Sequence, residues 1–281
     1  MAVDRTVLIT GTSSGIGLAA AVAAARAGFR VVATMRDPRR SGALLRTAEA
    51  AGVADRTEVA RLDVTDAASV AECLAVVLDR HGRLDAVVNN AGAGRVGTVE
   101  RDGLAPVREV MEVNFFGVVE VTRAALPHLR ATGGRVVTVT SVGGVVGQPF
   151  NEAYCAAKFA VEGFMESLAP VAATVGVAVS VVEPGAVASE FVASQGIDLP
   201  ALLAAAGPYA PALDAYAART RAAFDQAQTP EEAAETVVAA LTADRPPFRL
   251  QTSDRARAFV AAKLADLDGS AVQHLTAGWV A

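Results

Sequence analysis

A tyrosine and a lysine four residues apart are the pair in this chain with the clearest chemical potential. Tyr154 and Lys158 stand in a run of good helix formers, so we expect them on one helix face, one turn apart. An ammonium group near a phenol favours the phenolate and lowers the phenol pKa from about 10 toward the range of a proton-transfer catalyst. Alone, the pair is more typical of a solvated helix face, so its meaning depends on the rest of the chain.

The length and composition indicate a globular α/β protein. The chain has 281 residues, of which 52% are hydrophobic, and this suffices for one α/β domain or two small ones. A formal net charge of −5 argues against a nucleic-acid-binding surface and gives no support for an anionic membrane partner. No signal peptide and no uninterrupted apolar run of membrane-spanning length is evident, so we expect a cytoplasmic protein.

The cysteines and histidines show no metal-ligand spacing. Cys73 and Cys155 stand far apart in helical patterns, which favours buried thiols in a reducing compartment. His81, His128 and His274 are isolated from one another, so we expect surface or capping histidines and no metal.

A glycine-rich turn follows the first predicted strand, residues 7–9. Glycines there let the backbone turn sharply and approach a pyrophosphate, and the helix that begins near Ser14 and runs to about Ala27 points its free N–H groups at that phosphate. An ordinary glycine-rich strand-to-helix turn is the alternative. The candidate cofactor-binding residues are Gly11, Ser13, Ser14, Gly15, Ile16 and Gly17.

The tip of the second predicted strand, residues 30–34, indicates which dinucleotide binds. In dinucleotide folds an acidic residue there binds the ribose 2′-hydroxyl, whereas an arginine accommodates a 2′-phosphate. The usual acidic position falls on Met35, and Arg36 follows it. We therefore expect Arg36 to pair with a 2′-phosphate, with Thr34 as a hydroxyl partner, and we favour NADP(H) over NAD. A solvated loop arginine is the alternative.

Further polar residues follow the next two predicted strands, residues 59–62 and 84–88. Asp63, beside Val64, could accept a bond from the adenine amino group or cap the helix predicted over 66–80. The segment containing Asn90, Ala91 and Gly92 suits a floor beneath a cofactor.

Ser141 stands at the carboxyl end of the strand predicted over 134–140, and Tyr154 lies on the next helix, 151–174. A sixth strand is predicted over 177–182. The alternation of strands and helices predicts one parallel sheet with helices on both faces, and ligands bind outside the carboxyl ends of such strands. Asn114 lies in a helical apolar segment, where a structural hydrogen bond is the plain interpretation of its amide.

These motifs together resemble the short-chain dehydrogenase/reductase family, and the resemblance spans most of the chain. It implies a single-domain doubly wound Rossmann fold with a seven-stranded parallel sheet whose last strand lies near 248–250. It also implies that Tyr154 is the general acid in reduction, that Lys158 binds the nicotinamide ribose and lowers the tyrosine pKa, that Ser141 polarises the substrate carbonyl, and that Asn114 supports a water near Lys158. Near the nicotinamide the resemblance rests on Pro184 and Gly185, and it implies Val187 and Ser189 as further cofactor-binding residues. The family often has threonine at the position of Ser189, and serine keeps the hydroxyl. Two further segments look like the branch of 17-beta-hydroxysteroid and retinol dehydrogenases, namely 33–38 and the C-terminal extension, 251–281.

An apolar insertion, residues 190–225, is expected to cover the substrate, with a helix over 213–224; oligomer packing or simple core are the alternatives. The candidate substrate-contacting residues are Ser141, Gly143, Phe150, Tyr154 and Phe191. The mostly apolar walls favour a lipophilic ketone or alcohol that is steroid-, retinoid- or polyketide-like.

We therefore expect an NADP(H)-dependent oxidoreductase that interconverts a carbonyl and an alcohol, assembled as a homodimer or homotetramer. The rival hypothesis is a non-catalytic NADP-sensing regulatory or scaffold protein on the same fold.

Overall fold

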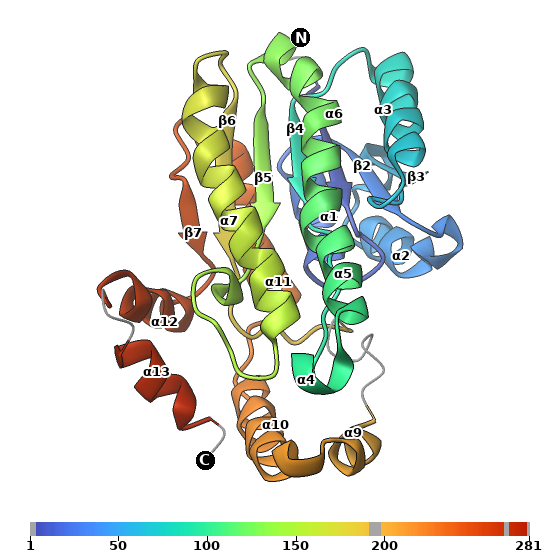
Figure 1. Ribbon diagram of the computed structural model, residues 1–281. Helices are drawn as coiled ribbons and strands as arrows, with labels where there is room; N and C mark the ends of the chain where they lie inside the picture. Colours follow the sequence, from blue (N-terminus) through green and yellow to red (C-terminus); the bar gives the residue numbers. More distant parts are fainter. Residues whose placement is uncertain (1–3, 191–197, 267–269, 280–281) are drawn as a thin grey trace.

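A parallel sheet of seven strands forms the centre of the molecule (Figure 1). The computed structural model describes residues 4–190, 198–266 and 270–279. The strands lie in the order β3-β2-β1-β4-β5-β6-β7, and all neighbours pair in parallel. Their bounds are β1 Thr6–Thr10, β2 Arg30–Met35, β3 Thr57–Arg61, β4 Ala86–Asn89, β5 Arg135–Val139, β6 Ala178–Glu183 and β7 Arg249–Gln251. The predicted seven-stranded doubly wound sheet is confirmed, with strand ends shifted by a few residues.

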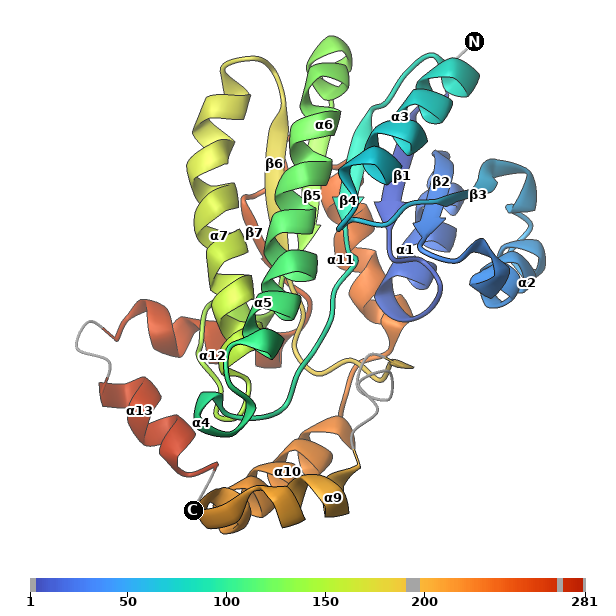
Figure 2. The same ribbon diagram turned by 45° about the vertical axis from the view of Figure 1, so that its right-hand side comes forward.

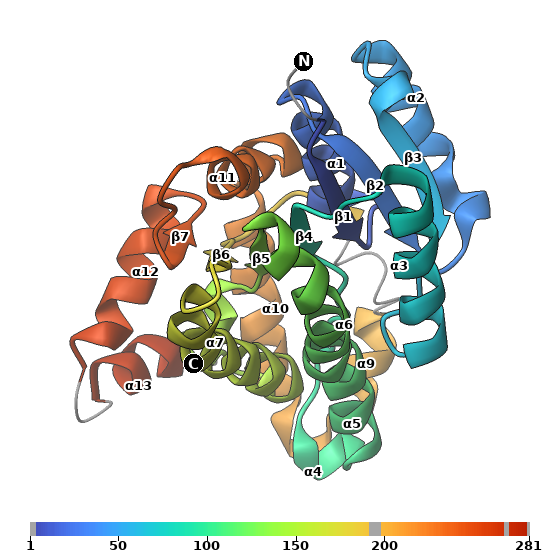
Figure 3. The ribbon, with the colours of Figure 1, turned by 90° about the horizontal axis from the view of Figure 1, so that it is seen from above.

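Helices cover both faces of the sheet, as the view in Figure 3 shows. On one face lie α1 (Gly15–Arg26), α2 (Gly42–Ala50) and α11 (Pro230–Thr242), and on the other α3 (Ala67–His81), α6 (Gly117–Thr132) and α7 (Glu152–Ala173). Successive side chains of β1 alternate between the two cores: Val7 and Ile9 pack toward α1, and Leu8 packs toward α3. Every residue of the central strands β1 and β4 is buried, and both strands are mostly apolar, whereas the edge strands β3 and β7 carry charged residues and have no buried residue.

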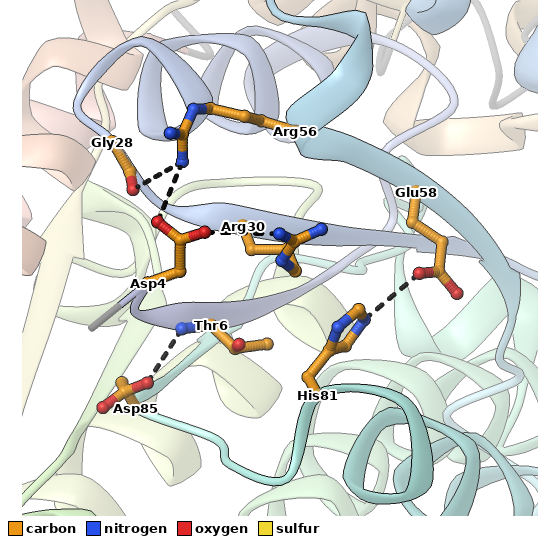
Figure 4. Close-up of polar contacts among 8 residues, drawn as sticks. All are labelled: Asp4, Thr6, Gly28, Arg30, Arg56, Glu58, His81 and Asp85. Atoms are coloured by element: carbon orange, nitrogen blue, oxygen red, sulfur yellow. Dashed lines mark hydrogen bonds and ion pairs between the residues drawn. The ribbon is translucent and has the colours of Figure 1, made fainter. Parts of the chain in front are cut away.

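The amino edge of the sheet is closed by polar contacts within the fold (Figure 4). Asp4 lies between Arg30 and Arg56, at 3.3 and 3.4 Å. The buried carboxylate of Asp85 accepts a hydrogen bond from the backbone N–H of Thr6 at 2.8 Å, which joins the starts of β4 and β1. These polar groups are used by the structure itself, so the open edge is the carboxyl one.

His81 has a structural contact with Glu58. Its Nε2 lies 3.1 Å from Glu58 Oε2, which places it at the end of α3 against β3 (Figure 4). Among the described residues, no group of three or more histidine, cysteine or acidic side chains could hold a metal ion.

Several helices lie beyond the carboxyl edge, below the strand arrowheads in Figure 1. They are α9 (Leu199–Ala205), the 3-10 turn η5 (Gly207–Tyr209), α10 (Ala210–Phe224), α12 (Asp254–Leu264) and α13 (Ser270–Ala277). Figure 2 shows α13 approaching α10 although the two are distant in sequence. None of the described helices combines the length and the apolar character that a membrane crossing needs.

Shorter elements complete the chain: η1 (Pro38–Ser41), η2 (Ala54–Arg56), α4 (Val99–Asp102), α5 (Ala105–Met111), η3 (Glu112–Phe116) and η4 (Val142–Gly144). The η3 segment is a π-helical turn inserted between α5 and α6, and it contains Asn114. The sequence predicted a plain helix there. Such π-turns in helices are frequent at functional sites because they redirect one side chain.

Candidate active site

A cavity of ≈ 1890 Å³ opens at the carboxyl edge of the sheet, where the strand order reverses between β1 and β4. Ligands of open α/β sheets bind at this kind of position. Most of the residues predicted from separate motifs line it. They are Gly11, Ser13, Ser14, Gly15, Ile16, Gly17, Arg36, Asp63, Val64, Asn90, Ala91, Gly92, Ser141, Tyr154, Lys158, Pro184, Gly185, Val187 and Ser189.

The β1–α1 turn has the geometry of an anion cradle. Gly17 is packed so closely that an added Cβ would lie 2.2 Å from the Gly11 carbonyl oxygen and 2.3 Å from Asn90 Nδ2. Gly15 has a φ of 57°, which a larger residue adopts only with strain. Ser14 is the N-cap of α1 but makes no side-chain capping bond, and no acidic residue lies in the first turn. The N–H groups at this end of α1 therefore fit a phosphate.

Asn90 braces this turn from the neighbouring strand. Its Nδ2 donates to the Thr10 carbonyl at 2.9 Å and to the Gly11 carbonyl at 3.0 Å. The Thr10 hydroxyl in turn accepts from the N–H groups of Asn90 and Ala91. Asn90 was predicted as part of a cofactor floor, and the structure adds that it fixes the shape of the glycine-rich turn.

At the tip of β2, Arg36 is exposed and lines the cavity, as does Arg40. Asp37, the acidic residue at this tip, accepts hydrogen bonds from the backbone and the guanidinium of Arg39, both groups at 3.1 Å or less. The expectation for Thr34 was wrong. Its side chain is fully buried and its hydroxyl donates to the Ile9 carbonyl of the neighbouring strand at 3.0 Å. Thr34 lies within β2, so its side chain is enclosed by the fold and does not reach the cavity.

Asp63 lies in the cavity wall and does not cap α3. The cap is Asp66, which accepts from the N–H groups of Ala68 and Ser69. Asp63 instead accepts from the N–H and hydroxyl of Thr65, at 3.0 and 2.8 Å. Burial would raise the pKa of Asp63, but these hydrogen bonds and the charges of Arg36 and Arg61 together lower it. Of the two alternatives considered for Asp63, the helix cap is excluded, and a bond to the adenine amino group is compatible with its place in the cavity wall.

Ser141 and Tyr154 are joined by a hydrogen bond between their side chains. The Ser141 oxygen also accepts from the backbone N–H of Gly143 at 2.9 Å. Burial raises the pKa of Tyr154 to about 12, although the bond to Ser141 acts in the opposite direction. The net direction of the Tyr154 pKa is opposite to the expected lowering, because burial outweighs the hydrogen bond from Ser141.

Lys158 lies beside this pair, one helix turn after Tyr154. Its Nζ donates to the Val139 carbonyl at 3.1 Å and lies 5.8 Å from the centre of the Tyr154 ring. Burial lowers the pKa of Lys158 to about 8. The ammonium group is thus held at the end of β5, between the phenol and the sheet edge.

Asn114 is fully buried and is not part of the cavity wall. Its Oδ1 accepts from the Ala93 N–H and its Nδ2 donates to the Ala93 carbonyl, both at 2.7 Å. A Cβ added to Gly92 would lie 3.2 Å from Asn114 Oδ1 and 3.8 Å from Lys158 Nζ, so both groups approach the same small residue. Asn114 therefore fixes the segment that follows β4, which agrees with the structural hydrogen bond considered from the sequence.

The substrate end differs from the prediction at two residues, Gly143 and Phe150. Gly143 is buried beside Ser141, and Phe150 packs behind Tyr216 with ring centres 5.6 Å apart, so neither lines the cavity. Phe191 lies outside the described residues. The insertion nevertheless reaches the cavity through α9 and α10. The cavity residues that the sequence did not single out are Asn151, Leu202, Leu213, Tyr216, Phe259 and Trp279.

Trp279 joins the C-terminal extension to α10 at the cavity wall. Its ring stacks on Phe259 at 5.7 Å, and the guanidinium of Arg219 lies 4.1 Å from its centre. The side chain is 9% exposed. Trp279 is the only tryptophan of the chain, and this was the one feature of the sequence that could have indicated a special role for it.

Comparisons with known proteins identify the family of this chain. A family model described as short chain dehydrogenase matches residues 5–199. The chain belongs to this family of oxidoreductases. It is 41% identical over 277 residues to retinol dehydrogenase 8 of Bos taurus, covering 95% of this chain and 87% of the relative. It is 40% identical over 270 residues to estradiol 17-beta-dehydrogenase 1 of Rattus norvegicus, covering 94% and 78%. The predicted branch of the family is thereby confirmed.

Solved structures of short-chain dehydrogenases have the same fold. One from Streptomyces avermitilis aligns with a TM-score of 0.77 at 32% identity, over 98% of this chain and 97% of its own. One from Burkholderia phymatum, in complex with NAD, aligns with a TM-score of 0.80 at 26% identity, over 95% and 96%.

Proposed function

We propose that this short-chain dehydrogenase is an NADP(H)-dependent oxidoreductase that interconverts a lipophilic ketone or aldehyde and its alcohol. The observation that supports this most is the hydrogen-bonded pair of Ser141 and Tyr154, placed in one cavity with Lys158 and the glycine-rich turn. A proton donor and an anion cradle in the same cavity fit a redox reaction in which a carbonyl oxygen is protonated.

Each side chain has a distinct role in the proposed reaction. Tyr154 donates its phenolic proton to the carbonyl oxygen, or accepts it when an alcohol is oxidised. The hydroxyl of Ser141 donates first to the carbonyl oxygen and then to the phenolate, so it polarises the substrate and stabilises the base. The ammonium of Lys158 stabilises the phenolate electrostatically and binds the ribose. A bound nicotinamide supplies or accepts the hydride at the carbonyl carbon.

The choice of NADP(H) over NAD rests on the tip of β2. Arg36 and Arg40 line the cavity there, and the carboxylate of Asp37 is occupied by Arg39. Guanidinium groups bind a phosphate in a bidentate manner, whereas a free carboxylate would be needed for a ribose hydroxyl.

The proposed substrate class rests on the apolar side chains of the cavity. Leu202, Leu213, Phe259 and Trp279 line the end away from the glycine-rich turn. The two curated relatives are named for retinol and estradiol, which are both lipophilic alcohols. We propose that α9 and α10 cover such a substrate and exclude water from the reacting carbonyl.

Oxidation of NADPH, followed at 340 nm with a panel of bulky ketones, tests this function. We expect turnover with at least one lipophilic ketone and a much lower rate with polar sugars. NADPH binding without turnover across the panel, in either direction, would support the sensor hypothesis instead. The intact set of Ser141, Tyr154 and Lys158 favours the enzyme.

A further inference from the structure

A buried cluster of charged side chains lies behind the proposed proton-transfer site, and the proposed function does not use it. Glu162 follows Lys158 by one turn on α7 and is 4% exposed, and Glu183, at the end of β6, is fully buried. Nε of Arg249 on β7 lies 3.3 Å from a carboxylate oxygen of each. Burying ionised carboxylates costs several kcal/mol per ion, even when they are paired, so the cluster needs an explanation.

Polar side chains from β7 and α7 complete the surroundings of the two carboxylates. From β7, Gln251 Nε2 donates to Glu183 at 2.9 Å. From α7, Glu166 pairs with the outer nitrogen of Arg249 at 2.9 Å, but its side chain is 59% exposed. The charges of the cluster are therefore two buried carboxylates, the buried Lys158 and the partly exposed Arg249. When both carboxylates are ionised, these charges balance only if Lys158 is protonated.

Thr140 allows Glu162 to exist in two protonation states. Its hydroxyl oxygen lies 2.5 Å from Glu162 Oε1 and 3.1 Å from the Val182 carbonyl oxygen. One hydroxyl proton cannot serve both acceptors. When Glu162 is ionised, Thr140 donates to it. When Glu162 is protonated, it donates to Thr140, which donates to Val182, and no heavy atom has to move.

The Glu162 side chain also lies against the loop that contains Ser141. Thr140 directly precedes Ser141, and Gly144 follows it by three residues. A Cβ added to Gly144 would lie 3.0 Å from Glu162 Cγ and 3.1 Å from the Lys158 carbonyl oxygen. The loop is thus held against α7 at Glu162 from both sides of Ser141.

We propose that Glu162 is a positioning residue of the proton-transfer site: a buried counter-ion that keeps Lys158 protonated and, through Thr140, holds the strand end that presents Ser141. The kinetic part of this inference rests on the proposed function, and the electrostatic part does not. Glu162 acts through its neighbours and does not reach the reacting atoms.

The ionisation of the two groups agrees with this arrangement. Burial raises the pKa of Glu162 to about 7, and burial lowers the pKa of Lys158 to about 8, while the charge of Glu162 raises the lysine value. Glu162 and Lys158 are both charged at a pH between these two pKa values. At lower pH Glu162 takes up a proton, and at higher pH Lys158 loses one. We therefore expect activity to fall at both lower and higher pH, with limbs that reflect the coupled titration of the two groups.

The composition of the chain offers a direct test, because Lys158 and Lys263 are its only lysines. Protein labelled with ¹³C at lysine Cε gives two signals, and the Lys263→Arg variant assigns them. We expect Glu162→Gln to lower the pKa of Lys158 by about one unit or more, a tenfold change in proton affinity. Glu166→Gln, which alters the same Arg249 cluster at its exposed end, should leave it unchanged. An unchanged Lys158 pKa in folded Glu162→Gln would overturn the proposal.

The kinetic readout separates positioning from a general structural role. Glu162→Gln should lower kcat about tenfold near pH 8 and move the alkaline limb of its pH profile to lower pH, with the KM for NADPH unchanged. Equal losses in Glu162→Gln and Glu166→Gln, without a change in the profile, would show a structural role and contradict the proposal. Failure of the wild type to reduce any carbonyl would contradict the proposed function, whereas the lysine titration would still decide the counter-ion.

Thr140→Val provides a second variant if Glu162→Gln does not fold. The Thr140 hydroxyl lowers the pKa of Glu162, so its removal should raise that pKa and shift the acidic limb of the kcat profile to higher pH. An acidic limb identical to that of the wild type would count against the proposal.

Discussion

The side chains of Ser141 and Tyr154 are hydrogen-bonded to each other at the carboxyl edge of the sheet. Because the Ser141 oxygen accepts from the Gly143 N–H at 2.9 Å, its own proton is free to point at the phenol oxygen. That bond lowers the pKa of Tyr154 against the larger effect of burial. Ser141 therefore favours the phenolate that proton transfer produces.

Replacing Ser141 tests this relationship. Ser141→Ala should reduce kcat roughly 10- to 100-fold, since one hydrogen bond to a charged group contributes about 1.5–3 kcal/mol. Ser141→Thr keeps the hydroxyl and should retain most of the activity. Steady-state kinetics with a saturating ketone would measure both variants. An Ala variant within twofold of the wild type would show that the bond plays no part in turnover.

The close contact at Gly17 predicts a defect in cofactor binding. A methyl group there would lie 2.2 Å from the Gly11 carbonyl oxygen, so Gly17→Ala must displace the turn. We expect the Kd for NADPH, measured by its fluorescence, to rise at least about tenfold because the N–H groups lose their alignment. Gly163→Ala on α7 is the matched control, since nothing lies within 4 Å of its added Cβ. Equal NADPH affinity in both variants would contradict the assignment of the turn.

Arg36→Ala tests the cofactor preference. Loss of the guanidinium should weaken NADPH binding about tenfold or more and leave NADH binding nearly unchanged, because only NADPH has the 2′-phosphate. Arg46→Ala is the control, since Arg46 is an exposed arginine on α2 that does not line the cavity. Calorimetric titration with both nucleotides gives the two ratios. Parallel weakening of NADH and NADPH would mean that Arg36 does not select the phosphate.

The wall formed by Trp279 predicts selectivity by substrate size. Trp279→Ala removes the ring between Phe259 and Arg219 and should raise the KM for bulky ketones about tenfold, with little effect on small ones. Trp279→Phe keeps an aromatic surface and should lie close to the wild type. The KM values of one bulky and one small ketone suffice for the measurement. An equal rise for both ketones would place Trp279 outside the substrate-binding region.

The sheet and most of the cavity could be predicted because both follow from the order of apolar strands and polar loop residues along the sequence. Each apolar strand run is followed by a residue that must lie at the carboxyl edge, and Ser141 and Arg36 are there for that reason. The error at Thr34 concerns side-chain direction, since Thr34 precedes the strand end by one residue and is buried. The π-helical turn that contains Asn114 was not predicted, because no periodicity reveals it.

The far end of the cavity was less predictable because it depends on long-range packing. Trp279 reaches the site only because the C-terminal extension packs against α10, and Tyr216 lies there because Phe150 supports it from behind. Neither contact has a local sequence signature. The pKa of Tyr154 was mispredicted for a related reason: sequence spacing showed the neighbouring lysine but not the extent of burial.

The assignment of Tyr154 as the proton donor is the centre of this account. Tyr154→Phe keeps the ring and removes only the hydroxyl, so the cavity should keep its shape and its affinity for NADPH. The decisive measurement compares kcat of wild type and Tyr154→Phe for a ketone that the wild type reduces, with NADPH binding confirmed by fluorescence. We predict a fall in kcat of at least about 10²-fold, the lower end of the contribution of a general acid, with the Kd for NADPH unchanged. Full turnover by Tyr154→Phe would contradict the account.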